Sequence, residues 1–294
     1  MSIIVHNVFI IMEADYFSVA VKEAKRFQRP PETIHNKELT IVSGGVEICK
    51  RGYFVDRSDF PYISIEIVTT GTGELVLNKK RYSLSPGIIF SYGPKVSHQM
   101  KGSEQKNMTK YFLNIQGSYA ESMVQKIFKK KNEVISCKDP LSILQTFDEL
   151  IATGLTITPK SGEICESLGK ILLLKLSENA LPATERSGQS YANFNRCHNY
   201  IKENFLELFS LYDIAESCNI DQGYLCRLYK RYDHQTPYQH LVRLKMNHAL
   251  ALLNIPGKMV KEIASELGFE DPFNFSRSFK RIFGVSPQAY QSKD

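Results

Sequence analysis

The chain has 294 residues, of which 43% are hydrophobic and 23% are charged, and its formal net charge is +6 at pH 7. This composition excludes a disordered or fibrous chain and leaves room for two domains. The apolar opening at residues 1–12 has no basic leader and no small-residue cleavage site, and it is too short to span a bilayer. We therefore expect a cytoplasmic protein that is not embedded in a membrane.

The first half of the chain is expected to be mostly β-structure followed by helices. Residues 38–116 contain short β-rich runs broken by Gly, Asn and Pro turn signals, which favours an antiparallel sandwich or barrel. From residue 118 the apolar residues recur three and four apart, as in helices. The helical segments 141–153 and 163–179 carry apolar stripes that fit either a dimer seam or packing against the barrel.

A linker is expected at residues 181–190, where LPATERSGQS contains Pro, Gly, Ser and Thr without an apolar period. Everything after it reads as helix and turn. Six cysteines are scattered without a Cys-x-x-Cys pair, so we expect neither a zinc knuckle nor a disulfide framework.

The last third of the chain contains an internal repeat. The segment DIAESCNI at 213–220 matches EIASELGF at 262–269, and YLCRLYKR at 224–231 matches NFSRSFKR at 274–281. Each copy reads as a helix, a tight turn and a second helix, which is the helix-turn-helix unit.

Local signals place the ends of these helices. Asn219 and Gly268 occupy the turns, because both residue types tolerate a left-handed backbone. Asp221 and Asp271 are the expected N-caps of the second helices, and Pro272 fits the first helical position. The two units then span about residues 211–231 and 260–283.

The second helix of each copy is expected to have one buried face and one exposed face. The inward residues are Leu225, Leu228, Tyr229 and Tyr232 in the first copy and Phe275, Phe279, Ile282 and Phe283 in the second. The opposite face fits the major groove of DNA, where Arg can bond guanine and an aromatic or methyl group can contact the thymine methyl. Basic residues late on each helix are expected to contact phosphates.

The candidate DNA-binding residues are Gly223, Cys226, Arg227, Lys230, Arg231, Phe273, Asn274, Ser276, Arg277, Lys280 and Arg281. Phe273 is the unusual member, since it is a large aromatic residue on a polar face. It is either a base reader or a first-turn residue that packs back on a neighbouring helix.

A long helix is expected between the two copies at residues 236–253. It begins with Thr236, Pro237 and Gln239, which form a capping box with proline at the first position. At about 1.5 Å per residue it would be roughly 27 Å long, which could hold two recognition helices about one turn of DNA apart.

As a set, these residues resemble the two-helix-turn-helix domain of the AraC/XylS family of bacterial transcription regulators. The match covers about residues 194–292, and its strongest part is EIASELGFEDPFNFSRSFKRIFGVSPQAY. RLKMNHALALL at 243–253 resembles the family's connecting helix. The resemblance implies a sequence-specific regulator of double-stranded DNA, an activator that acts with RNA polymerase as a homodimer.

One departure from the family pattern concerns the first recognition helix. Gly223 and Cys226 stand where the family usually presents larger polar or aromatic groups. Base reading by that helix would then depend on Arg227 nearly alone.

The stretch GTGELVLNKKRYSLSPGIIFSYGPKVSHQM is similar to the cupin-like domain that many family members use for effector binding and dimerisation. The expected fold class is therefore α+β with two domains: a cupin-like antiparallel β-barrel with helices over residues 1–180, and an all-α DNA-binding domain over residues 191–294. A barrel interior can hold one small ligand, which the resemblance favours as a sugar or another small metabolite. The candidate effector-binding residues are Arg57, Tyr62, Glu66, Tyr92 and His98, and surface pairing is an equally open reading for each.

Metal and enzyme chemistry are not expected. Metal-binding cupins supply a His-x-His pair, a Glu and a later His, whereas here only His98 lies near such a position. A single His cannot complete a zinc or iron site, and we predict no cofactor. The sequence also lacks the motifs of common hydrolases and nucleotide-binding enzymes. A cupin-type enzyme fused to a DNA-binding domain, and a dimeric regulator without a ligand, remain the alternatives.

Overall fold

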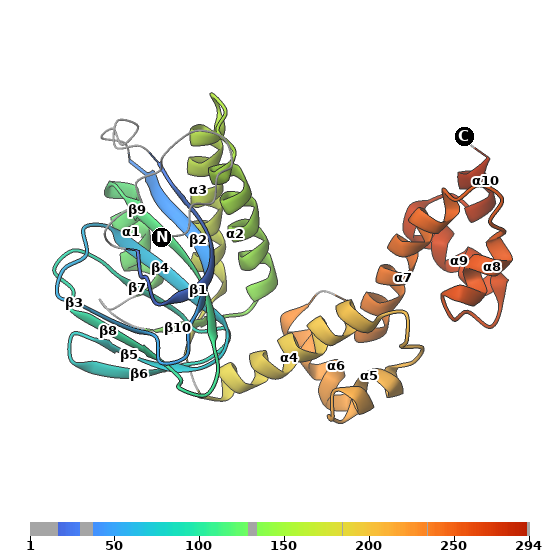
Figure 1. The fold of residues 1–294 in the computed structure, drawn as a ribbon, viewed down its shortest axis with the longest axis horizontal. Helices are drawn as coiled ribbons and strands as arrows, with labels where there is room; N and C mark the ends of the chain where they lie inside the picture. Colours follow the sequence, from blue (N-terminus) through green and yellow to red (C-terminus); the bar gives the residue numbers. More distant parts are fainter. Residues whose placement is uncertain (1–16, 30–37, 129–133, 184, 234, 293–294) are drawn as a thin grey trace. The chain divides into compact units, whose positions relative to one another are not determined.

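The computed structural model describes residues 17–29, 38–128, 134–183, 185–233 and 235–292 (Figure 1). The chain divides into two compact units, an N-terminal unit at Met1–Ala192 and a C-terminal unit at Asn193–Asp294. The opening segment at 1–12 lies outside the described residues. Within the described ranges, no helix combines the length and the apolar character that crossing a bilayer requires.

The first unit contains two antiparallel β-sheets. In the larger sheet the strands follow the order β1 (Val21–Gln28), β2 (Thr40–Cys49), β9 (Met108–Gln116), β4 (Ile63–Thr70), β7 (Ile89–Tyr92), β10 (Ile135–Cys137) and β11 (Ala180–Pro182). In the smaller sheet the order is β3 (Phe54–Arg57), β8 (His98–Gly102), β5 (Gly73–Leu77) and β6 (Lys80–Leu84). The fold class expected from the sequence is confirmed for this domain.

Both faces of the larger sheet are covered. Along β4, Ile65 and Ile67 join an apolar cluster on the outer face, while Glu66 and Val68 alternate with them and point inward. The outer face carries α1 (Ser118–Ile127), α2 (Pro140–Leu155) and α3 (Ser161–Asn179) (Figure 1).

Two glycines let the helix backbones approach the sheet closely. A Cβ atom on Gly154 of α2 would lie 2.4 Å from the Phe27 ring, and one on Gly169 of α3 would lie 2.5 Å from Ile41. Packing against the sheet, one of the two interpretations that the apolar stripes left open, is thus one role of these helices.

The stretch expected to be a linker, residues 181–190, contains regular secondary structure. Strand β11 includes residues 181 and 182, and helix α4 (Glu185–Asn204) includes residues 185–190. The composition of this stretch indicates a linker, but Tyr191, Phe194 and Cys197 follow at helical spacing and are buried. Tertiary packing of these residues outweighs the weak local helix preference.

The second unit continues with six helices in its described part. They are α5 (Leu211–Ser217), α6 (Gln222–Tyr232), α7 (Pro237–Leu253), α8 (Val260–Glu266), α9 (Pro272–Phe283) and α10 (Pro287–Gln291). Helices α5 and α6 form the first helix-turn-helix unit, α8 and α9 form the second, and α7 connects them, which confirms the predicted order.

The helix ends also agree with the local signals. Asn219 and Gly268 have positive φ values of 49° and 75° in the two turns. The Asp221 side chain accepts a hydrogen bond from Tyr224 N, and Asp271 accepts one from Phe273 N. The capping box of α7 is formed by reciprocal bonds between Thr236 and Gln239.

Candidate functional site

The predicted DNA-binding residues share one property, which is accessibility. Ten of the eleven are exposed, and Ser276 is half-buried. The opposite face of each recognition helix is buried as predicted, with Leu225 and Tyr229 in the first helix-turn-helix unit and Phe275 and Phe279 in the second. On α9, Ile282 is partly exposed and Phe283 half-buried, so the end of that stripe is shallower than expected.

Phe273 does not pack back on a neighbouring helix, because 77% of it is exposed. It lies in the first turn of α9, where Asp271 caps the helix. A surface hollow of about 500 Å³ runs along this side of α9, lined by Phe273, Ser276, Lys280 and three neighbouring residues. The aromatic ring therefore stands free to contact another molecule.

Arg277 is oriented by its neighbours on the same helix. Its Nη2 donates a hydrogen bond to Asn274 Oδ1 at 2.7 Å and lies 4.0 Å from Asp271 Oδ2. On α6, the Arg227 guanidinium lies 5.7 Å from the centre of the Tyr224 ring. Both side chains are thus partly pre-positioned, which lowers the entropy lost when they bind.

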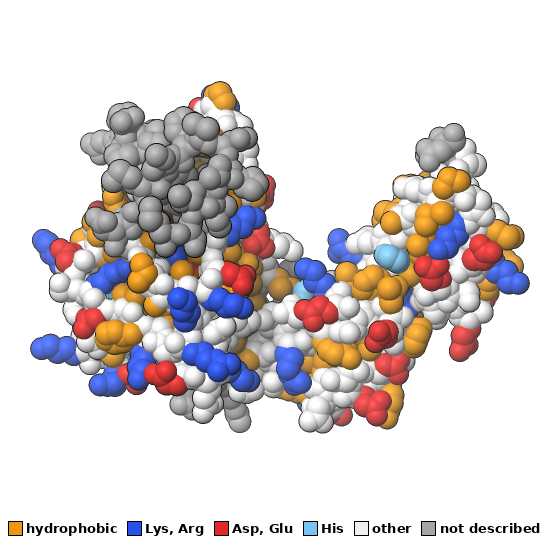
Figure 2. Space-filling model, in the orientation of Figure 1, with side chains coloured by type: hydrophobic (Ala, Val, Ile, Leu, Met, Phe, Trp, Pro, Cys, Tyr) orange, Lys and Arg blue, Asp and Glu red, His pale blue; other side chains and the backbone are white. Residues whose placement is uncertain are grey.

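The charge of the C-terminal compact unit, Asn193–Asp294, is distributed rather than uniform. Over the face that Figure 2 shows, acidic and basic side chains are mixed across the C-terminal helices. Acidic residues such as Asp213, Asp221 and Asp271 are used as helix caps. Basic residues lie in the last turns of α6 and α9, namely Lys230, Arg231, Lys280 and Arg281.

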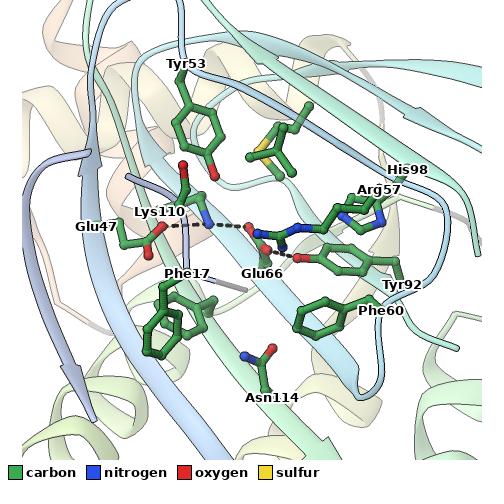
Figure 3. Close-up of a pocket in the computed structure, with 14 residues that line it drawn as sticks. Phe17, Glu47, Tyr53, Arg57, Phe60, Glu66, Tyr92, His98, Lys110 and Asn114 are labelled. Atoms are coloured by element: carbon green, nitrogen blue, oxygen red, sulfur yellow. Dashed lines mark hydrogen bonds and ion pairs between the residues drawn. The ribbon is translucent and has the colours of Figure 1, made fainter. Parts of the chain in front are cut away.

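The N-terminal compact unit, Met1–Ala192, holds a polar pocket between its two sheets (Figure 3). The larger sheet contributes Glu47, Glu66, Tyr92, Lys110, Phe112 and Asn114. The smaller sheet contributes Val55, Arg57, His98 and Met100, and Phe17, Ser18, Tyr53 and Phe60 complete the wall from connecting segments.

A chain of paired charges crosses the pocket. Lys110 Nζ lies 3.0 Å from Glu47 Oε2 and 2.9 Å from Glu66 Oε2 (Figure 3). Glu47 also pairs with Arg26, whose Nε lies 3.0 Å from Glu47 Oε1, and Tyr92 donates to Glu66 Oε1 at 2.5 Å. All four ionised groups are buried and each is paired, as stable buried charges must be.

The strand register explains this arrangement. Glu47 on β2 stands directly opposite Lys110 on β9, and Glu66 on β4 lies diagonally across from it. Burial alone would lower the pKa of Lys110, but the attraction of Glu47 and Glu66 outweighs it, and the pKa stands well above its ordinary value. Lys110 therefore stays charged.

His98 and Tyr92 form the other polar wall. Their rings stack with centroids 3.8 Å apart, and His98 is buried. Burial lowers the pKa of His98 to about 4, so the imidazole is neutral at neutral pH and offers one donor and one acceptor. Burial, reinforced by Glu66, raises the pKa of Tyr92 well above its ordinary value, so the phenol keeps its proton.

The free space in the pocket is small, at about 30 Å³. Pockets that enclose drug-sized ligands are typically about 300–1,000 Å³. Asn114 Oδ1 lines the space without a hydrogen-bond partner among the described residues, while its Nδ2 donates to Ser43 Oγ. A ligand of monosaccharide size would enter only if lining side chains moved.

Four of the five predicted effector residues line this pocket: Arg57, Glu66, Tyr92 and His98. Tyr62 does not line it, and instead its ring meets the Phe60 ring edge-on at 6.1 Å. Glu47, Lys110 and Asn114 also line the pocket but are not among the effector-binding residues that the sequence predicts. The signal for Lys110 and Asn114 was the alternation in MTKYFLNIQ, which puts both on one face with Phe112.

No group of three or more His, Cys, Asp or Glu side chains in the described part of the chain is arranged to hold a metal ion. His98 meets aromatic rings, with the Phe60 ring 6.5 Å away in addition to Tyr92.

Two regions of the chain match models of known domains. Residues 42–173 match the AraC-like ligand binding domain, and residues 214–293 match a helix-turn-helix domain. The first region contains the pocket, and the second contains both recognition helices.

Three named relatives are similar to this chain. The Msm operon regulatory protein of Streptococcus mutans serotype c is 25% identical over 88% of this chain and 95% of its own length. The lactose operon transcription activator of Staphylococcus xylosus is 23% identical over 86% of this chain and 92% of its own. The raffinose operon transcriptional regulatory protein of Pediococcus pentosaceus is 31% identical over 37% of this chain and 39% of its own.

Proposed function

Because the chain belongs to the AraC family of transcription regulators, we propose that it activates specific promoters when a carbohydrate occupies the pocket of its first unit. The observation that carries the DNA-binding part is the two-sided character of α6 and α9. Each helix buries its apolar face and leaves a polar face with Arg227 or Arg277 open to a groove.

The chemistry of the pocket supports a neutral, polyhydroxylated effector. Its wall carries the carboxylates Glu47 and Glu66, which are already paired with Lys110 and Arg26, together with the amide of Asn114 and several aromatic rings. Carboxylate and amide oxygens accept hydrogen bonds from hydroxyl groups, and the aromatic rings offer apolar faces. Two of the relatives are named for lactose and raffinose operons, which agrees with a sugar.

The homodimer is proposed from α3. Ile164, Ile171 and Leu174 are 45%, 43% and 52% exposed and fall within about 80° of one another on the helix. An apolar stripe of this kind is a candidate seam for a second copy. We further propose that the dimer acts in the bacterial cytoplasm and contacts RNA polymerase at the promoter.

A regulator is favoured over an enzyme by the state of the pocket's ionisable groups. Glu47 and Glu66 are held in ion pairs, and His98 is neutral. The pKa of His98, at about 4, lies below the working pH at which a general acid or base acts best, and the paired carboxylates can bind and orient a ligand.

The test is a footprint of the full chain on genomic DNA fragments, with and without a panel of sugars. We expect protection of two blocks about ten base pairs apart for each chain, and a change in the footprint with one sugar. Failure to select any DNA would overturn the DNA-binding function. A footprint that no sugar alters would overturn the carbohydrate effector.

A thermal-unfolding assay with the same panel adds a matched pair of variants. The responding sugar should raise the melting temperature of the native chain, since a ligand at about 100 times its dissociation constant adds about 2.7 kcal/mol. Glu66→Gln, in the pocket, should lose this rise. Glu74→Gln, an exposed carboxylate on β5 outside the pocket, should keep it.

A further inference from the structure

The two helix-turn-helix units meet at the turn of the second unit, in addition to sharing helix α7. Phe209 precedes Ser210, the N-cap of α5 in the first helix-turn-helix unit, and Gly268 lies in the turn of the second. A Cβ atom on Gly268 would lie 2.1 Å from the Phe209 ring, so the ring rests directly on the glycine backbone. Any larger residue at 268 would displace it.

Lys245 of α7 lies at the same point and contacts both units. Its Nζ donates a hydrogen bond to the Leu267 carbonyl at 2.7 Å and lies 4.6 Å from the centre of the Phe209 ring. Only 3% of the residue is exposed. The Leu267 carbonyl ends α8, where a cation is favourably placed against the helix dipole.

The ammonium group makes both contacts. Burial lowers the pKa of Lys245 to about 8, and nearby Asp213 opposes this shift, so the group is still largely protonated at neutral pH. One charge thus satisfies a carbonyl of the second unit and attracts the ring face of the first.

Each end of the contact is anchored in its own unit. Asp213 of α5 accepts hydrogen bonds from Phe209 N and Ser210 N, both at 2.9 Å, which holds the chain that carries the ring. On the other side, Leu267 is buried in the same apolar cluster as Met246 of α7. A shift of one unit against the other must therefore break the contact.

We propose that Phe209, Lys245, Leu267 and Gly268 form a clasp that fixes the two helix-turn-helix units in one relative position and so sets the spacing of the two DNA blocks that one chain reads. The inference rests on the proposed DNA-binding function. Lys245 acts here as a positioning residue, because its ammonium is buried away from the exposed recognition faces.

The first test measures spacing preference in the full chain. Lys245→Met keeps an unbranched side chain that is one atom shorter and removes both polar contacts. Binding is measured on DNA with both blocks at the native spacing, with one base pair inserted or deleted, and with one block replaced.

The expected result is a loss of about tenfold or more on the native two-block site, with unchanged binding to a single block. The ratio of the affinity at native spacing to the affinity at altered spacing should fall towards one. An equal loss on single-block and two-block DNA, or an unchanged spacing preference, would overturn the inference.

Lys258→Met is the matched control. It removes the same charge from the same domain, but its partner Glu266 lies within the second unit. It should keep the native spacing preference. Phe209→Leu, which removes the ring and retains an apolar side chain, should relax the spacing preference as Lys245→Met does. It replaces Lys245→Met in the spacing test if the lysine variant does not fold.

The second test needs no DNA and separates this inference from the proposed function. Cys226 on α6 is the exposed cysteine, whereas the other five are buried. A spin label on Cys226 and a second on Ser276→Cys report the distance between α6 and α9 by pulsed electron resonance. Labelled chains are diluted with unlabelled ones so that distances within a single chain dominate.

The native clasp should give a narrow distance distribution, and Lys245→Met should broaden it. Identical distributions would overturn the clasp even if DNA binding were established. A broadened distribution in a protein that selects no DNA would retain the clasp and reject the proposed function.

Discussion

At the scale of single residues, Arg277 tests direct reading of bases. Its guanidinium is exposed and oriented by Asn274. We expect Arg277→Ala to lose about 1–3 kcal/mol of binding energy on the preferred site and to relax the choice of base at one position. Lys280→Ala is the comparison, since loss of a phosphate contact should weaken all sequences alike. Uniform weakening by both variants would show that Arg277 contacts phosphate; the readout is binding to a library of site variants.

Another residue-scale prediction concerns pH. His240 of α7 stacks on His198 with ring centroids 4.3 Å apart, and its Nδ1 lies 2.9 Å from the Tyr229 hydroxyl. Burial, reinforced by His198, lowers the pKa of His240 to about 3. The unfolded chain therefore takes up the proton at a higher pH than the folded chain does.

The free energy of unfolding should consequently fall as the pH drops below about 6.5, by up to about 1.4 kcal/mol per pH unit from this group. His240→Asn, which keeps an acceptor near the position of Nδ1, should reduce that slope. Urea unfolding of both proteins between about pH 7 and about pH 4 gives the comparison. Equal slopes would contradict the prediction.

At the scale of elements, α3 is the test of dimerisation. Leu174→Glu places a charge in the exposed apolar stripe of Ile164, Ile171 and Leu174. Burying an unpaired charge in an interface is costly, so the dimer should dissociate to monomers. Sedimentation equilibrium measures the change. Ile157→Glu, at an exposed position between α2 and α3, should leave the dimer intact; dissociation by both variants, or by neither, would count against the α3 seam.

Helix α4 shows how far element-scale reading from sequence extends. Residues 185–190 have the composition of a linker, yet they are helical because Tyr191, Phe194 and Cys197 bury one face of the same helix. The caps of the repeat's second helices can be predicted from sequence, because the Asp221 and Asp271 side chains accept hydrogen bonds from backbone N–H groups two or three residues further along the chain.

At the scale of the whole molecule, salt dependence tests how the protein binds DNA. If roughly six phosphates are neutralised by Lys and Arg, affinity should fall about a thousandfold between about 50 and 200 mM salt. Arg231 and Arg281, late on the two recognition helices, are the expected contributors. Binding titrations at about four salt concentrations give the slope of log affinity against log salt concentration. An affinity that does not change with salt would show that Lys and Arg do not contact phosphates.

The pocket marks the limit of sequence reading at this scale. Arg57, Glu66, Tyr92 and His98 were chosen by residue type and region, and they do line the pocket. Tyr62 does not line this pocket, because it lies just before strand β4, where the sequence does not show which way a side chain points.

The sequence by itself determined what depends on neighbours within a few residues: helix caps, turns with positive φ, the apolar faces of α6 and α9, and the repeat that they form. Only the tertiary structure decided which distant residues meet. Glu47, Glu66 and Lys110 come from three different strands, and Lys245 reaches Phe209 and Leu267 from another helix. Local backbone preferences are encoded in short segments, whereas the pairing of buried charges depends on strand register and helix packing, which are set by the whole fold.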